Sequence, residues 1–263
     1  MTVSTFETNR GAVSVEQVGE GPDLVMLHSL LSDRHVFDPV VPALAERWRV
    51  NLVDLPGFGA TGVVEVGIDN YADAVGALLD SGGFDPSSTA VLGNGLGAFV
   101  ALGAAVRHGG RFDRLVLVGC GATFPDGATA AFTSMAARVD EGGMGAVMDV
   151  AVRRIFSEDF LAAHPELEAE RREVLGHTDP AAFRTACLSL VGLDYRAAVG
   201  SITNPTLVVV GSDDLATPPA MGRDLADRIP GAGYIELPGI AHAPQLQDPT
   251  GFMAAVGPFL GMG

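Results

Sequence analysis

The stretch Gly93-Asn94-Gly95-Leu96-Gly97 decides the fold, because two strong local patterns meet there. Residues 88–92, Ser-Thr-Ala-Val-Leu, form the short apolar and β-branched run that is typical of a buried parallel strand. Residues 96–108 continue as an Ala- and Leu-rich segment that predicts a helix. The flanking glycines carry no β-carbon, so the strand and helix backbones can nearly touch. The sequence therefore predicts a strand, a sharp turn and a helix in direct succession.

This succession has the frame Gly-x-Ser-x-Gly of a nucleophile elbow, with Gly95 at the position of the serine. In such a turn the serine hydroxyl stands exposed above the end of the sheet, where it can attack a carbonyl carbon. Glycine offers no hydroxyl group. We therefore expect the scaffold of a hydrolase that lacks its usual attacking atom.

Strand-like and helical patterns alternate along the chain, which predicts an α/β fold with a mainly parallel sheet covered by helices on both faces. The expected strands are residues 23–28, 49–54, 88–92, 114–119, 205–211 and 234–237. The expected helices are residues 39–47, 71–80, 96–108, 219–228 and 249–260. Between residues 122 and 201 only helical segments are expected, which we interpret as an inserted helical lid. The core domain would then consist of residues 1–121 and 202–263, with residues 122–201 as the lid.

The composition agrees with one such domain in a reducing environment. The chain has 263 residues with 48% apolar content, enough to bury a substantial core. Two cysteines, Cys120 and Cys187, give no disulfide framework, and the opening MTVSTFETNR lacks the basic and apolar regions of a signal peptide. No apolar run reaches the roughly 18 residues that span a bilayer. We expect a cytoplasmic protein without a membrane partner.

The charge excludes several kinds of chemistry. The formal net charge of -16 combines 32 acidic residues with 16 basic ones, all of them arginines. The absence of lysine rules out Schiff-base catalysis and a lysine-dependent phosphate loop. A chain this acidic would repel nucleic acid. A small-molecule substrate is expected instead, while the oligomeric state stays open.

Neither a cofactor nor a metal is expected. The glycines around Gly95 lack the spacing of a dinucleotide-binding fingerprint. Four of the histidines, His35, His108, His164 and His177, show no metal-ligand spacing.

The carboxyl ends of two further strands carry candidates for a catalytic pair, since active residues of open parallel sheets gather there. Residues 211–218 form a Gly-x-x-Asp-x-x-x-Pro turn in which Asp214 can reach an imidazole, with Asp213 as the alternative. His242 follows the last strand in a short loop. The chain order of elbow, acid and histidine is the one seen in hydrolases of this class.

The loop after residues 23–28 is expected to supply part of an oxyanion hole. Its backbone donor would be Leu30, and the second donor would be Leu96, the residue after the nucleophile position. We assign His28, Ser29 and Cys120 to the substrate-binding region. For His28 a role in bracing the loop, and for Cys120 that of a buried thiol, are the alternatives.

These motifs together resemble an α/β-hydrolase-fold protein, and within that superfamily the chain is similar to the 3-oxoadipate enol-lactonase group. The resemblance implies Asp214 as acid, His242 as base, Leu30 and Leu96 as oxyanion donors, and a serine where Gly95 stands. The resemblance covers nearly the whole chain. The residues that carry it are His28-Ser-Leu-Leu-Ser-Asp-Arg-His-Val-Phe-Asp38, Asn51-Leu-Val-Asp-Leu-Pro-Gly-Phe-Gly59, Ala163-His-Pro-Glu166, residues 205–219, Ile240-Ala-His242, Pro249 and Phe252.

Three explanations of Gly95 are open. The chain is a serine hydrolase inactivated by a Ser-to-Gly change, or an enzyme that works without acylating itself, or a ligand-binding protein on the same fold. Retention of both Asp214 and His242 argues against the ligand-binding protein, which would not need them. We therefore expect an enzyme that acts on a small or medium carbonyl compound, such as a lactone, an ester or a cleavable ketone, with His242 as general base.

The expected lid contains arginines that could recognise a substrate carboxylate. Arg138, Arg184 and Arg196 are candidates, and charges on a solvated helix surface explain them equally well. The apolar side chains of the same segment, such as Phe132 and Met135, are expected mostly to pack the lid against the core.

Overall fold

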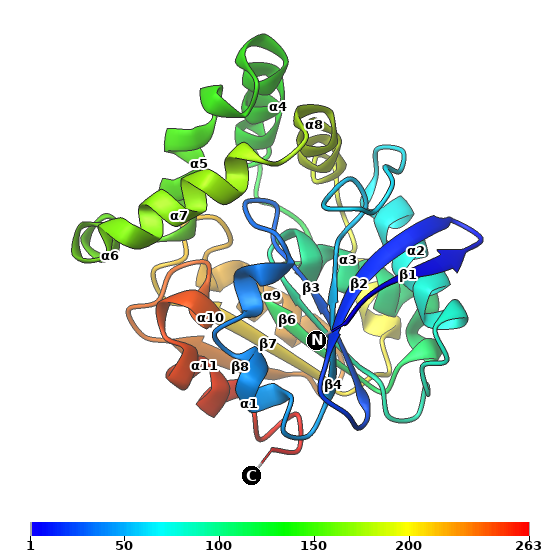
Figure 1. Ribbon diagram of the computed structural model, residues 1–263. Helices are drawn as coiled ribbons and strands as arrows, with labels where there is room; N and C mark the ends of the chain where they lie inside the picture. Colours follow the sequence, from blue (N-terminus) through cyan, green and yellow to red (C-terminus); the bar gives the residue numbers. More distant parts are fainter. Residues whose placement is uncertain (1, 263) are drawn as a thin grey trace.

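The computed structural model describes residues 2–262 and contains one mixed sheet covered by helices (Figure 1). The strand order of this eight-stranded sheet is β1-β2-β4-β3-β5-β6-β7-β8. The first strands, β1 and β2, are antiparallel to their neighbours, and all other pairs are parallel. The mainly parallel sheet confirms the predicted fold class.

The parallel strands lie close to the ranges predicted from the apolar runs. Each of them is almost completely buried except β8, which lies at the edge of the sheet. Their bounds are β3 (Asp23–Leu27), β4 (Arg49–Val53), β5 (Ala90–Asn94), β6 (Arg114–Val118), β7 (Thr206–Gly211) and β8 (Gly233–Leu237).

An N-terminal hairpin, β1 (Thr2–Thr8) and β2 (Gly11–Val18), was not among the predicted strands. Its first strand alternates between exposed and half-buried residues and is rich in threonine and serine, so it has no apolar run. The turn ends at Gly11, whose φ of 106° favours glycine. The alternation of polar and apolar residues from Thr2 to Val18 is the signal that identifies such a pair.

Helices cover both faces of the sheet and form two separate cores. On one face lie α2 (Ile68–Ser81), α3 (Leu96–His108) and α9 (Pro219–Arg228). On the other lie the short α1 (Val41–Leu44) and α11 (Pro249–Val256). Residues of α3 such as Ala98 and Leu102 are fully buried, which explains why this helix has no polar face.

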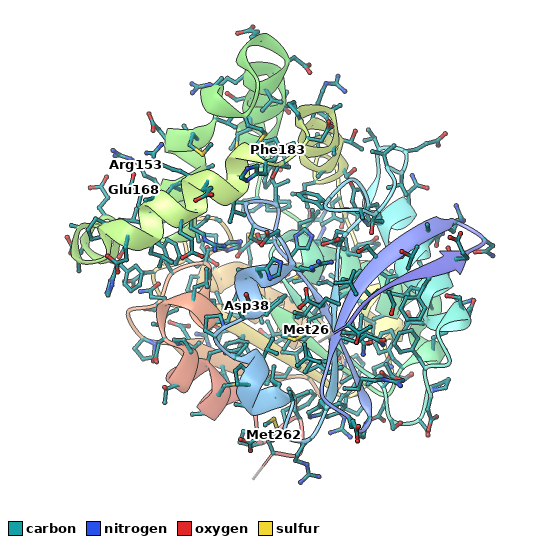
Figure 2. All side chains as sticks on the ribbon, viewed as in Figure 1. Met26, Asp38, Arg153, Glu168, Phe183 and Met262 are labelled. Atoms are coloured by element: carbon teal, nitrogen blue, oxygen red, sulfur yellow. The ribbon has the colours of Figure 1, made fainter. Side chains whose placement is uncertain are left out.

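The segment between β6 and β7 is helical, and its helices lie together above one end of the sheet (Figure 1). Figure 2 shows Met26 within the sheet and Arg153 and Glu168 in this upper layer. Two pairs, α4 with α8 and α5 with α7, pack against each other. The bounds are α4 (Ala130–Gly142), α5 (Met148–Ile155), α6 (Glu158–Ala163), α7 (Pro165–Gly176) and α8 (Pro180–Ser189). Across residues 2–262, every helix is too short or too polar to cross a bilayer.

One backbone hydrogen bond closes the base of this helical segment, and another joins the segment to the core. At the base, the Tyr195 amide donates to the Ala122 carbonyl over 2.8 Å, which holds the two ends of the segment together. At its other side, the His242 amide donates to the carbonyl of Ile155, the last residue of α5, over 3.1 Å. The loop that carries His242, just before α10 (Pro244–Gln247), is therefore fixed directly to the helical layer.

Candidate active site

The predicted turn at Gly95 is present, with β5 ending at Asn94 and α3 beginning at Leu96. Gly95 has φ 56° and ψ −119°, a conformation that side-chain-bearing residues rarely adopt. Its amide donates to the Val118 carbonyl over 2.9 Å, which holds the turn against β6. The turn is therefore set by backbone contacts and does not depend on a side chain at residue 95.

The outer glycines of the turn are required for a close approach of backbones. A β-carbon at Gly97 would overlap the Leu27 carbonyl and lie 2.7 Å from the His28 oxygen. A β-carbon at Gly93 would overlap the Gly97 carbonyl. These contacts involve main-chain atoms, so no rotamer change can relieve them.

Replacing Gly97 by alanine is therefore expected to destabilise the fold by at least about 1–3 kcal/mol, the usual cost of overpacking. The matched control is Gly110→Ala, because a β-carbon at Gly110 would meet nothing within 4 Å. Urea unfolding of the two variants measures the difference. Equal midpoints for both variants would contradict the close approach.

Asp214 and His242 lie within hydrogen-bond distance of each other at the carboxyl ends of β7 and β8. The Nδ1 atom of His242 is 2.8 Å from Oδ2 of Asp214, and both residues are buried. Asp213, the alternative acid, points to the surface and accepts a hydrogen bond from Ser212. Asp214 is therefore the carboxylate that orients the imidazole.

The Asp214 carboxylate is held ionised by its surroundings. Burial opposes the charge, but His242 and hydrogen bonds from the Thr217 amide and hydroxyl outweigh it and lower the pKa of Asp214. The amides of Ala216 and Thr217 donate to Oδ1 over 2.8 and 2.9 Å, and the Thr217 hydroxyl donates to Oδ2 over 2.7 Å. A fixed anion at this position stabilises a protonated His242.

The other ring nitrogen of His242 faces Gly95. Nε2 lies 2.7 Å from the position that a β-carbon of residue 95 would occupy, and the Ser29 hydroxyl lies even closer to that position. Among the described residues, neither Nε2 nor the Ser29 hydroxyl has a hydrogen-bond partner. The space beside the Gly95 Cα is therefore bounded by two polar atoms that are free to bind.

Two backbone amides border the same pocket. Neither Leu30 nor Leu96 donates its N–H to any residue that the structure describes. Leu96 is the first residue of α3, so its amide belongs to the unpaired N-terminal turn and carries the positive end of the helix dipole. Both amides are available to an oxygen that develops negative charge.

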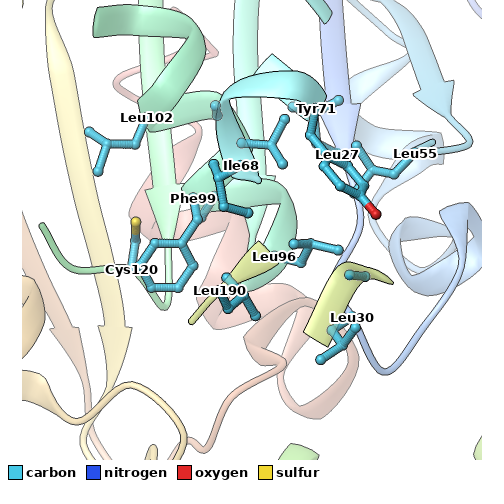
Figure 3. Close-up of a cluster of buried hydrophobic side chains, with 14 of the residues drawn as sticks. Leu27, Leu30, Leu55, Ile68, Tyr71, Leu96, Phe99, Leu102, Cys120 and Leu190 are labelled. Carbon is cyan, nitrogen blue, oxygen red and sulfur yellow. The ribbon is translucent and has the colours of Figure 1, made fainter. Parts of the chain in front are cut away.

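The pocket around these polar groups is small and mostly apolar. Figure 3 shows Leu96, Phe99 and Leu190 close together on one side of it. Phe132 and Met135 of α4 also line the pocket. Some apolar side chains of the helical segment therefore contact the pocket in addition to packing in the core. An uncharged acyl or alkyl group fits these walls best.

A family model described as "Alpha/beta hydrolase family" matches residues 24–256, which include the turn, Asp214 and His242. The chain belongs to the alpha/beta hydrolase family. Its mixed eight-stranded sheet and the position of the pocket at the carboxyl ends of the parallel strands fit this membership.

Two curated relatives of this alpha/beta hydrolase carry the name pimeloyl-[acyl-carrier protein] methyl ester esterase. The protein from Chromobacterium violaceum is 34% identical over 250 residues, which cover 92% of this chain and 95% of the relative. The protein from Aeromonas hydrophila is 32% identical over 263 residues, covering 95% and 100%. Among solved structures, the enol-lactonase from Burkholderia xenovorans LB400 has a TM-score of 0.91 at 28% identity, covering 98% of this chain and 100% of that one.

Two residues assigned to substrate binding are not at the pocket of this alpha/beta hydrolase. His28 is fully buried, with Nδ1 2.9 Å from the Ser29 carbonyl and Nε2 accepting from the Leu55 amide over 3.2 Å. Its role is to brace the loop that carries Ser29 and Leu30. Cys120 is also fully buried, and burial raises the pKa of its thiol far above the usual value. Figure 3 shows it next to Phe99, where it fills space in the core.

The arginines singled out from the sequence lie elsewhere on the molecule. Arg184 pairs with Asp140 over 2.8 Å, and Arg196 pairs with Asp194 over 2.7 Å. Arg138 is exposed. The arginines that line the pocket region are Arg154 and Arg171. The sequence does not distinguish Arg154 and Arg171 from other arginines, because each stands directly next to a second arginine. These neighbours, Arg153 and Arg172, form ion pairs outside the pocket region.

Proposed function

We propose that this alpha/beta hydrolase cleaves the ester or lactone bond of a small or medium carbonyl compound, using a water molecule as nucleophile. One observation carries the proposal: four polar atoms without partners among the described residues converge beside Gly95. They are Nε2 of His242, the Ser29 hydroxyl, and the amides of Leu30 and Leu96. The names of the relatives, which describe ester and lactone substrates, support the same bond type.

The reaction follows from the positions of these atoms. A water molecule beside the Gly95 Cα gives a proton to Nε2 of His242 while its oxygen attacks the carbonyl carbon. The carbonyl oxygen becomes negative and accepts hydrogen bonds from Leu30 and Leu96. When the tetrahedral intermediate collapses, the bond to the alkoxide breaks and His242 returns the proton to it. The products are a free acid and an alcohol, and no acyl-enzyme forms.

General principles give the size of each contribution. Each oxyanion donor is worth roughly 3 kcal/mol at the transition state, because it points at charge that develops only there. A positioned general base contributes typically about 10²- to 10⁴-fold in rate. The buried Asp214 keeps His242 in the tautomer that presents an unprotonated Nε2 to the pocket. These contributions are sufficient for catalysis without a covalent nucleophile.

Gly95 lacks the methylene and hydroxyl groups of a serine side chain, and the proposal places a water molecule in the space that they would occupy. The Ser29 hydroxyl and Nε2 of His242 flank this position, so a water held there accepts one hydrogen bond and donates the other. Ser29 would thus fix the water that His242 deprotonates.

Replacing Ser29 by alanine is expected to lower kcat about tenfold, corresponding to the roughly 1.4 kcal/mol of one hydrogen bond made to the reacting water. A double-mutant cycle with His242→Ala checks the assignment. If both side chains act on one water, the double variant is no slower than His242→Ala alone. Additive losses would place the Ser29 hydroxyl on a different atom.

A direct test of the whole proposal combines steady-state kinetics with intact-mass measurement. The unmodified chain is assayed against a panel of p-nitrophenyl esters and simple lactones. Turnover with linear release of p-nitrophenol and no mass increase on the protein is the expected result. A burst with an acyl adduct would overturn the water mechanism, and an absence of turnover with tight binding would indicate a ligand-binding protein.

A further inference from the structure

A second cavity lies beside His242, next to the apolar pocket. It is smaller than the first pocket and shares Ser29 and His242 with it. Its other polar lining side chains are those of Ser32, Asn94 and Arg171. A group bound in this cavity would therefore lie next to the proposed base and to the proposed water position.

Arg171 is the unusual member of this lining. It belongs to α7 and is only 2% exposed, which makes it the largest fully buried side chain of the described chain. Its Nη2 atom contacts the carboxylate of Glu170, which is itself 57% exposed. Its Nε and Nη1 atoms are buried and have no hydrogen-bond partner among residues 2–262. Two guanidinium donors are thus left unused where water is largely excluded.

Such an arrangement costs stability. Removing a cation from water costs several kcal/mol unless a partner and further hydrogen bonds compensate, and Glu170 reaches only one edge of the guanidinium. The neighbouring Arg172 shows the ordinary solution, because it is over a third exposed and pairs with both Asp149 and Glu168. Buried donors that lack a protein partner indicate a ligand that supplies the acceptors.

The other arginine near the site is placed differently. Arg154 lines the apolar pocket, is partly exposed and lies over the Phe132 ring at 5.9 Å. Burial lowers the pKa of Arg154, against the opposing effect of the nearby Asp214 charge, yet the side chain keeps contact with solvent. Of these two arginines, Arg171 is the one that is completely buried and has donors without a partner among the described residues, and it lines the cavity beside His242.

We propose that this cavity is an anion subsite, in which the Nε and Nη1 groups of Arg171 bind a carboxylate. The Ser29 hydroxyl lines the same cavity, but its single proton is given to the reacting water, so the donors for the carboxylate are those of Arg171. Charge-assisted bonds of this kind are about twice as strong as neutral ones. The carboxylate is either carried by the substrate, in which case the inference rests on the proposed function, or is a free small acid.

Two measurements distinguish these sources. The first is the binding of sodium acetate to the whole chain at constant ionic strength, by calorimetry or by the shift in Tm, with sodium chloride as reference. The second is kcat/KM for two p-nitrophenyl esters of equal chain length, the valerate and the half-ester of glutaric acid. The binding measurement needs no turnover, so it stays informative if the proposed function fails.

Arg171→Met is the test variant and Arg172→Met the matched control on the same helix. If the substrate carries the carboxylate, the unmodified chain and Arg172→Met have a higher kcat/KM for the half-ester than for the valerate. In Arg171→Met this ratio falls at least tenfold, mainly because KM for the half-ester rises. If the ligand is a free acid, acetate binds and raises Tm only where Arg171 is present, without a preference between esters. Either result supports the subsite.

The inference is overturned if Arg171→Met binds acetate and discriminates between the esters as the unmodified chain does. It is also overturned if Arg154→Met, and not Arg171→Met, removes the discrimination. Methionine matches the length of the arginine stem and removes a buried charge, so Arg171→Met is expected to have a Tm at least as high as that of the unmodified chain. Should Arg171→Met fail to fold, Arg171→Lys keeps the charge with fewer donors and is expected to show an intermediate loss.

Discussion

Replacing His242 by alanine is expected to lower kcat by about 10²- to 10⁴-fold, the usual contribution of a positioned general base. The physical reason is that Nε2 is the one unpaired basic atom beside Gly95 within the described chain, while Nδ1 is already held by Asp214. The loss should appear in kcat more than in KM, since the apolar walls that bind the substrate stay in place. Steady-state kinetics with p-nitrophenyl esters measures both constants.

The control for this variant is His164→Ala. His164 is a half-exposed residue of the helical layer that contacts Glu166, and it is not among the residues that line the pocket. The variant His164→Ala should therefore leave kcat unchanged. Circular dichroism of both variants checks that the fold is intact. An unchanged kcat in His242→Ala would rule out the proposed mechanism, because no other base occupies that position.

Replacing Gly95 by serine is expected to convert the chain to covalent catalysis, with a burst of p-nitrophenol and an acyl adduct on residue 95. The new hydroxyl would stand next to Nε2 of His242 and in front of the Leu30 and Leu96 amides. Activity on activated esters should rise by one to several orders of magnitude, since covalent attack divides one difficult step into two easier ones.

Two structural costs accompany this gain. A side chain at φ 56° and ψ −119° is strained by about 1–3 kcal/mol, which urea unfolding will show as lower stability. The new β-carbon would also overlap the Ser29 hydroxyl, so Ser29 must rotate. The double variant Gly95→Ser with Ser29→Gly removes that overlap and should be the more active of the two.

A comparison of the unmodified chain with Gly95→Ser distinguishes the three explanations of Gly95. Slow turnover without an adduct in the unmodified chain, and a burst in Gly95→Ser, support the water mechanism. Activity only in Gly95→Ser indicates an inactivated serine hydrolase. Ligand retention without turnover in either protein indicates a binding protein, and would remove the basis for the catalytic roles of Asp214 and His242.

Much of this arrangement is predictable from sequence because it depends on local patterns. Continuous apolar runs predict the parallel strands within one or two residues, and the Gly-x-Gly-x-Gly turn predicts the junction of β5 and α3. Positions at strand ends, together with the chain order of elbow, acid and histidine, point to Asp214 and His242, and the structure brings their side chains within 2.8 Å. These features have strict steric or spacing requirements, so they restrict which residues can stand at each position and can be recognised from the sequence.

The features that the sequence analysis missed depend on three-dimensional surroundings. The β1–β2 hairpin has no apolar run, because β1 alternates between exposed and half-buried residues and the polar Ser14 and Glu16 interrupt the apolar residues of β2. His28 and Cys120 stand at strand ends as active residues do, yet their side chains turn into the core. Arg171 directly precedes Arg172 in the sequence, and only the packing around α7 in the helical layer distinguishes the buried cation from the solvated one.

The hydrogen bond from the His242 amide to the Ile155 carbonyl has a consequence for access to the pocket. Any outward movement of α5 that admits a ligand must break this bond or carry the histidine loop along with it. If the loop moves with the helix, His242 loses its alignment with Asp214, and proton transfer has to wait until α5 has returned. In that case a ligand is enclosed before the imidazole can act as a base.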